Sequence, residues 1–104
     1  MAEFLKVAKV RDVPPGEMIG VDIGDNKVAI ANVDGELFAF DSECTHAAGW
    51  LHQGFLEGGN VQCPVHFAEF AVRTGEVMEP PAGVPVKTYL VRAQGGDVEI
   101  EYPS

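Results

Sequence analysis

The sequence predicts an all-β domain, a small antiparallel sandwich or barrel with one loop-rich insert. Three observations lead to this fold class. Apolar residues alternate with polar ones in several short runs, turn sequences separate those runs, and no segment keeps a helical period over three turns. With 104 residues, the chain is expected to form a single domain, residues 1–104, around one modest core.

Turn signals delimit the expected strands of the first half. Pro-Pro-Gly at 14–16 marks the first turn, and Gly-Asp-Asn at 24–26 reads as a hairpin connection. Asp34-Gly35 is the strongest short hairpin signal in the chain. The strands expected between these turns are residues 4–10, 17–23, 27–33 and 36–41.

The second half begins where the alternation stops, after Asp41. Residues 42–59 are rich in Gly, small residues and His, which is typical of a loop wrapped around a bound group. Residues 79–85 cannot form a central strand because their prolines lack amide donors. Short strands are expected at 60–63 and 67–72, and a closing hairpin at 86–93 and 97–102 around Gly95-Gly96.

The charge balance is strongly acidic, with 16 acidic against 7 basic side chains and a net charge of -9. Such a surface repels phosphate backbones, so we expect no nucleic-acid partner. The acidity either steers the protein toward basic partners or only keeps it soluble. No apolar run reaches the ~20 residues that span a bilayer, and the first residues do not read as a signal peptide. These features predict a cytoplasmic protein with no membrane partner.

Both cysteines and all three histidines lie in one stretch, from residue 44 to residue 66. Cys44 is followed by His46, and Cys63 by His66, with sixteen residues between the two pairs. A structural zinc site more often pairs two cysteines in one knuckle and two histidines on a helix. One Cys and one His in each loop instead suits a binuclear cluster to which each loop gives one ligand per metal ion. The remaining histidine, His52, is expected at the surface.

The pattern C-x-H, sixteen residues, C-P-x-H is similar to the binding motif of Rieske iron–sulfur proteins. SECTHAAGWLHQGFLEGGNVQCPVHFAEFAVRTGEV and the closing VKTYLVRAQGGDVEIE also resemble Rieske ferredoxins of bacterial aromatic-ring dioxygenase systems, so the resemblance covers essentially the whole chain. It implies a Rieske-like antiparallel β-sandwich or barrel with a cluster-binding subdomain at about residues 42–75. It also implies one [2Fe–2S] cluster, with Cys44 and Cys63 on the buried iron and His46 and His66 on the outer one.

The same resemblance implies a one-electron carrier rather than an enzyme. It would take electrons from a flavin-dependent NAD(P)H reductase and pass them to a terminal oxygenase in aromatic hydrocarbon catabolism, acting as a monomer. After the cluster takes its ligands only His52 remains, too few for a mononuclear iron site, and no GxGxxG follows a strand. The alternatives are a Rieske component of a nitrite reductase or diiron monooxygenase system, and a zinc-stabilised interaction domain.

Several loop residues bear on the electronic properties and the docking surface. High-potential Rieske proteins place Ser and Tyr hydroxyls where this chain has Ala68 and Phe70, neither of which can donate a hydrogen bond to the cluster. We therefore predict a low potential, toward the bottom of the Rieske range of about -150 to +300 mV. Leu51 is expected to pack under the loops, and Trp50 either packs there or joins a docking patch. Phe67 either lies on the docking rim or shields the cluster.

Overall fold

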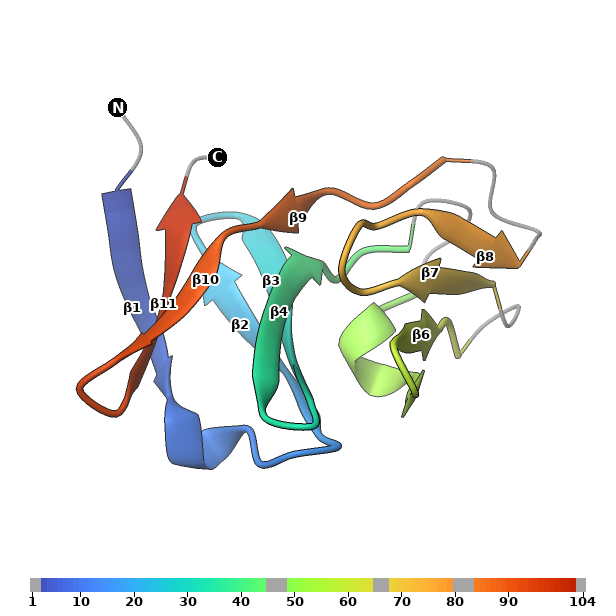
Figure 1. Ribbon diagram of the computed structural model, residues 1–104. Coiled ribbons are helices and arrows are strands. Elements are labelled where there is room, and N and C mark those ends of the chain that lie inside the picture. Colours follow the sequence, from blue (N-terminus) through green and yellow to red (C-terminus); the bar gives the residue numbers. More distant parts are fainter. Residues whose placement is uncertain (1–2, 45–48, 65–67, 80–83, 103–104) are drawn as a thin grey trace.

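The computed structural model describes residues 3–44, 49–64, 68–79 and 84–102, which form three antiparallel sheets (Figure 1). Their orders are β1-β11-β10, β2-β3-β4-β9 and β5-β6-β7-β8. The strands are β1 (Glu3–Lys9), β2 (Met18–Ile23), β3 (Asn26–Val33), β4 (Glu36–Asp41), β5 (Phe55–Glu57), β6 (Asn60–Gln62), β7 (Glu69–Ala71), β8 (Val77–Glu79), β9 (Thr88–Tyr89), β10 (Val91–Gln94) and β11 (Asp97–Tyr102). The helical segments of the described residues are two 3₁₀ turns, η1 (Val10–Asp12) and η2 (Leu51–Gln53), so the all-β class is confirmed.

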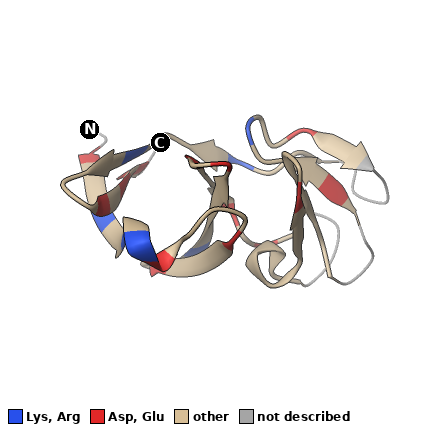
Figure 2. Ribbon diagram, turned by 60° about the horizontal axis from the view of Figure 1, so that its bottom comes forward, with Lys and Arg blue, Asp and Glu red and all other residues tan. Residues whose placement is uncertain are grey.

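The first two sheets form one body, whose strands surround a common centre in Figure 2. Apolar side chains fill that centre, including Val28 and Ile30 of β3 and Val98 and Ile100 of β11, all fully buried. Successive side chains of a strand point to opposite faces, so the alternation of these strands places one face in the core. We call this unit the body.

The central strand β3 separates two cores. Its residues Val28 and Ile30 belong to the core of the body, whereas Ala29 and Ala31 belong to a second core that also contains both cysteines. All four side chains are fully buried, which explains why this strand reads as a continuous apolar run rather than a strict alternation. The small alanine face allows the part of the chain that contains both cysteines to approach the sheet closely.

The hairpin between β3 and β4 forms as its sequence predicts. Asp34 and Gly35 both have positive φ values, 54° and 95°, as a type I′ turn requires. The buried side chain of Asn32 holds the turn, because its Oδ1 accepts from the Gly35 N–H at 2.7 Å. Its Nδ2 donates to the Val13 carbonyl, also at 2.7 Å. The amide thereby ties this hairpin to the connection that follows η1.

The structure differs from the expected strands at three places. The run expected at 86–93 is two strands, because β9 pairs with β4 and β10 pairs with β11. The break lies at Leu90, whose side chain is 63% exposed. Strands β5 and β8 were not expected, and they complete the third sheet. In the described ranges, no helix is long and apolar enough to cross a membrane.

Candidate cluster-binding site

The first cluster-binding loop begins at Cys44, three residues after β4 ends. The Cys44 N–H donates to the Gly49 carbonyl at 2.9 Å, and Glu43 forms an antiparallel bridge with Trp50. One step further out, the Leu51 N–H donates to the Ser42 carbonyl at 2.6 Å. This short ladder closes the loop at its base, so the backbone of Cys44 is held on both sides.

The second cluster-binding loop begins at Cys63, directly after β6. The Cys63 N–H donates to the Ala68 carbonyl at 2.7 Å, and the chain continues into β7. In both loops, therefore, the amide of the cysteine bonds the carbonyl five residues later. The two cysteines occupy equivalent places at the first position of two similarly closed loops.

Gly54 lies where the two loops meet. It follows η2, and a Cβ added to it would lie 2.0 Å from the Gln62 carbonyl oxygen and 3.0 Å from Cδ of Pro64. Gln62 and Pro64 flank Cys63, so the end of the first loop contacts the second directly beside a predicted ligand. Only the missing side chain of glycine permits this approach. Gly54 was not predictable from the sequence, since a glycine in a loop carries no local sign of what it touches.

Both cysteines suit metal ligation. Cys44 is 4% exposed and Cys63 is fully buried, and the two belong to one cluster of buried side chains. Neither forms a disulfide bond. Two thiol side chains that reach one buried region from separate loops are a donor set that soft and borderline metals favour. The cysteines thus fit the group that the sequence resemblance implies.

The two histidine ligands predicted from the sequence, His46 and His66, lie outside the described residues, as does Phe67. Among the described residues alone, no group of three or more His, Cys, Asp or Glu side chains could hold a metal ion. The structure therefore brings together the two cysteines, while the ligand set as a whole stays a prediction.

The residues around the cysteines are apolar. Ala68, Phe70 and Leu51 are all fully buried, in the same cluster as the cysteines. Leu51 packs under the loops as predicted, and neither Ala68 nor Phe70 brings a hydrogen-bond donor. Trp50 is 38% exposed, with the Lys27 ammonium 5.7 Å from its ring centroid. Trp50 therefore belongs to the surface next to the first loop more than to the core.

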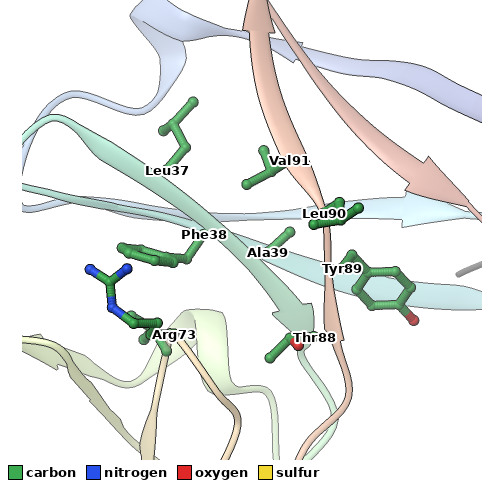
Figure 3. Close-up of a pocket in the computed structure, with 9 residues that line it drawn as sticks. Leu37, Phe38, Ala39, Arg73, Thr88, Tyr89, Leu90 and Val91 are labelled. Carbon is green, nitrogen blue, oxygen red and sulfur yellow. The ribbon is translucent and has the colours of Figure 1, made fainter.

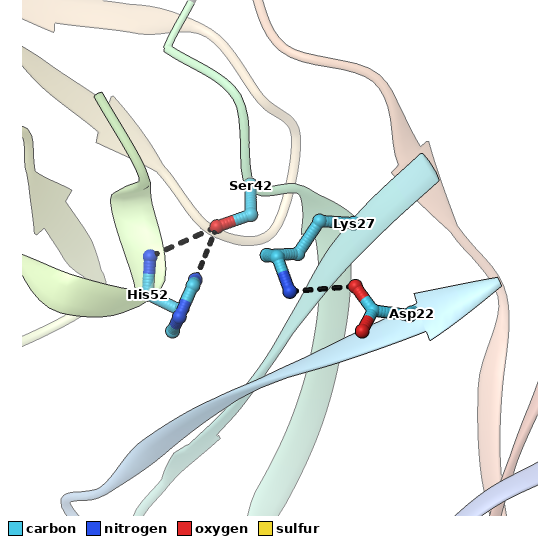
Figure 4. Close-up of polar contacts among 4 residues, drawn as sticks. All are labelled: Asp22, Lys27, Ser42 and His52. Carbon is cyan, nitrogen blue, oxygen red and sulfur yellow. Dashed lines mark hydrogen bonds and ion pairs between the residues drawn. The ribbon is translucent and has the colours of Figure 1, made fainter. Parts of the chain in front are cut away.

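His52 was predicted to lie at the surface, but the structure shows it partly buried against the body. Its Nδ1 lies 2.7 Å from Oγ of Ser42, and its backbone N–H donates to the same oxygen at 3.1 Å (Figure 4). Burial lowers the pKa of His52 below 6.5, and the nearby Lys27 ammonium lowers it further, against an opposing effect of Asp22. The sequence carried no signal for this pair, because Ser42 and His52 belong to no motif.

A cleft of about 350 Å³ lies away from the cysteines, between β4, β9, β10 and the turn after β7 (Figure 3). The Arg73 guanidinium covers the Phe38 ring with 4.9 Å to the centroid, and it pairs with both carboxylate oxygens of Glu36. Leu90 lines the same cleft. The residues that line it bring no Cys, His or carboxylate, so the cleft is not a metal site.

Comparison with known proteins identifies the family. Residues 3–90 match the model of the Rieske [2Fe–2S] domain. The chain is 45% identical over 100 residues to the biphenyl dioxygenase ferredoxin subunit of Pseudomonas sp. (strain KKS102), covering 95% of this chain and 92% of the relative. The ferredoxin of Sphingomonas yanoikuyae B1 matches with a TM-score of 0.92 at 35% identity, covering 97% of this chain and all of the other.

A further solved structure shows a relative with its partner. It is a complex of reduced oxygenase and oxidised ferredoxin in carbazole 1,9a-dioxygenase, and it matches with a TM-score of 0.88 at 32% identity. The match covers 93% of this chain and 91% of that chain. These similarities imply a Rieske cluster with Cys and His ligands, a group that the two buried thiols fit. The chain belongs to the Rieske [2Fe–2S] family and is a ferredoxin of that family, an electron carrier rather than an enzyme.

Proposed function

We propose that this ferredoxin carries single electrons from a flavoprotein NAD(P)H reductase to the terminal oxygenase of an aromatic-ring dioxygenase system. The observation that carries the proposal is the similarity along nearly the whole chain to the biphenyl dioxygenase ferredoxin subunit. The relative solved together with an oxygenase supports the choice of that partner. Membership of the Rieske family favours an iron–sulfur cluster over the zinc alternative. We further propose that the protein acts as a monomer in the cytoplasm.

The proposed ligands are Cys44 and Cys63 for the inner iron and His46 and His66 for the outer one. When bound, the cluster supplies one-electron chemistry. The chain supplies two buried thiolates. The backbone N–H of each cysteine donates a hydrogen bond to the carbonyl five residues later, which fixes its position. The apolar surroundings exclude water from the sulfur side, which protects the thiolates from oxidation. These ligands define the cluster-binding subdomain, proposed at about residues 42–75 of a single Rieske domain, residues 1–104.

Apolar neighbours also support a low potential. A hydrogen bond to a cluster sulfur or a ligand thiolate stabilises the more negative reduced state and raises the potential. Ala68 and Phe70 line the buried region of the cysteines without a side-chain donor. The proposed carrier therefore works toward the bottom of the Rieske range, where it can reduce the next centre of an oxygenase.

The charge of the cluster-binding part suits a basic partner surface. Residues 42–75 include Glu43, Glu57 and Glu69 and one basic residue, Arg73, which is paired with Glu36 of the body. In Figure 2 the strands of this part carry red segments, which mark Asp and Glu, and no blue ones. Complementary charge raises the association rate of transient partners and makes that rate fall with salt. Trp50 and Phe55, 38% and 58% exposed, add apolar surface to the same part.

Two experiments test this function. An EPR spectrum of the dithionite-reduced protein, with iron and sulfide analysis of the same sample, should show the rhombic, low average g signal of a His-ligated [2Fe–2S] centre. Stopped-flow oxidation by a terminal dioxygenase should then slow as salt is added, and slow further when either Glu57 or Glu69 is replaced by Gln. Glu17→Gln, an exposed acidic residue of the body, is the matched control. A spectrum without this signal would refute the carrier, and equal rates in all variants would refute acidic docking.

A further inference from the structure

Ser42 joins the body to the first cluster-binding loop. It is fully buried and follows β4 directly. Its N–H donates to the Lys27 carbonyl at 2.9 Å, and its carbonyl accepts from the Leu51 N–H at 2.6 Å. Its hydroxyl contacts both the backbone and the ring of His52 (Figure 4). All polar groups of this one residue thus link β3 to η2, the turn that ends the loop.

The ring of His52 fills a space that β2 leaves open. A Cβ on Gly20 would lie 2.7 Å from Cγ and Nδ1 of the ring. The Trp50 ring lies on another side, with centroids 6.5 Å apart. The imidazole therefore packs against β2 of the body while its own backbone belongs to η2. A side chain at residue 20 would leave no room for the ring in this position.

The contacts of the ring bear on the protonation state of His52. The Ser42 hydroxyl has one proton, and its oxygen already accepts the backbone N–H of His52. The hydroxyl proton is free to reach Nδ1, at 2.7 Å, and this contact suits a neutral ring with an unprotonated Nδ1 and its hydrogen on Nε2. The charged groups facing the ring are Lys27 of β3 and Asp22 of β2, which bond each other at 2.6 Å. Burial and Lys27 both lower the pKa of His52, in agreement with a neutral ring.

We propose that Ser42 and His52 form a clasp that positions the first cluster-binding loop, with the neutral imidazole holding η2 against the body. The clasp lies at the base of that loop, since Ser42 precedes Cys44 by two residues and pairs with Leu51. Without it, η2 loses its side-chain anchor on the body, and the loop that begins at Cys44 gains freedom. The inference rests on the ligand set proposed above.

The test compares two replacements of His52 in the cluster-loaded protein. His52→Asn keeps an acceptor, Oδ1, at the place of Nδ1, whereas His52→Leu keeps the size and loses the acceptor. Gln53→Ala, an exposed neighbour on η2, is the control. The Leu variant should release iron to excess chelator about tenfold faster, as expected for one lost buried hydrogen bond. It should also show broader EPR lines, while the Asn and Gln53 variants stay close to wild type.

The line widths separate positioning from general stability. A residue that only stabilised the fold would lower the Tm and leave the EPR lines of loaded protein unchanged. Equal line widths and release rates in His52→Leu and wild type would overturn the clasp, and so would an Asn variant that behaves like the Leu variant. If the Leu variant fails to load, ¹⁵N NMR of the oxidised wild-type protein decides, since a protonated Nδ1 on His52 at neutral pH would also overturn it. A wild-type protein without any cluster signal would overturn the proposed function as well.

Discussion

Gly54→Ala tests whether close contact between the two loops holds the cluster site together. The added Cβ would lie 2.0 Å from the Gln62 carbonyl oxygen, where ordinary contact needs more than 3 Å, so a movement of about 1 Å is required. The obstacle is backbone and not the end of a flexible side chain. Gly54 also cannot slide away freely, because its N–H donates to the Leu51 carbonyl at 2.9 Å. The movement therefore displaces Gln62 and with it the adjacent Cys63.

The expected cost follows from this geometry. Overpacking a well-packed site costs typically ~1–3 kcal/mol, and a clash with backbone on two connected loops belongs at the upper end, about 3 kcal/mol. For a domain of this size each kcal/mol lowers the Tm by about 4–8 °C, which gives a fall of about 12–24 °C. Small domains are stable by about 5–15 kcal/mol, so the variant still folds at 25 °C.

The assay is thermal unfolding followed by far-UV circular dichroism, with the visible circular dichroism of the cluster recorded on the same sample. Gly59→Ala is the matched control: it makes the same change between β5 and β6, where a Cβ meets nothing within 4 Å and φ is not positive. The control should keep the wild-type Tm, whereas Gly54→Ala should have a lower Tm and a weaker visible circular dichroism signal from the cluster. Equal Tm values for the two variants, with an unchanged visible spectrum, would refute the reasoning.

Four further predictions concern single residues. Cys63→Ala should abolish iron and sulfide binding and destabilise the loops, because ligation is coupled to their folding. A variant with full iron content would refute the assignment of Cys63 as a ligand. Ala68→Ser should raise the potential in a redox titration by about 60 mV, the equivalent of ~1.4 kcal/mol for one electron, and no shift would mean that residue 68 does not face sulfur. The free energy of unfolding in urea should fall below pH 6.5, since the unfolded chain binds a proton there that neutral His52 does not, and His52→Asn should make this fall smaller. Tyr89→Phe removes a 2.5 Å hydrogen bond to the Asp41 carboxylate and should cost about 2 kcal/mol in the same assay; an unchanged midpoint would contradict it.

The hairpins of the body were predictable because their signals are local. Asp34-Gly35 supplies the two positive φ values of a tight turn, and Gly95-Gly96 does the same between β10 and β11. The break at Leu90 was not predictable, because the pattern of residues 86–93 suits one continuous strand. Which sheet each half joins depends on β4 and β11, far away in the sequence. Strand pairing between distant segments leaves little trace in a local pattern.

The site shows the same division between local and distant causes. The cysteines could be proposed as ligands from the sequence because the chemistry of ligation demands particular residue types at a restricted spacing. Gly54 and Ser42 could not, because each matters for what it contacts across the fold: a carbonyl near Cys63 and a histidine ring on η2. His52 was expected at the surface because a histidine outside a motif usually lies there. The missing side chain of Gly20, on another strand, makes the space for its ring.

The β5–β6 hairpin has a consequence for how such motifs are found in other genomes. The described residues between the two ligand pairs, 49–62, include η2 and this hairpin. A Cβ added at Gly58 or Gly59 in its turn would meet nothing within 4 Å, although the Gly59 carbonyl accepts from the Val72 N–H at 2.9 Å. The number of intervening residues is therefore set in part by the length of this hairpin and not by the metal alone. Sequence searches that require sixteen residues would overlook proteins with a longer hairpin and the same two loops. The open space at Gly58 is also a place where a peptide tag or fluorophore can be attached.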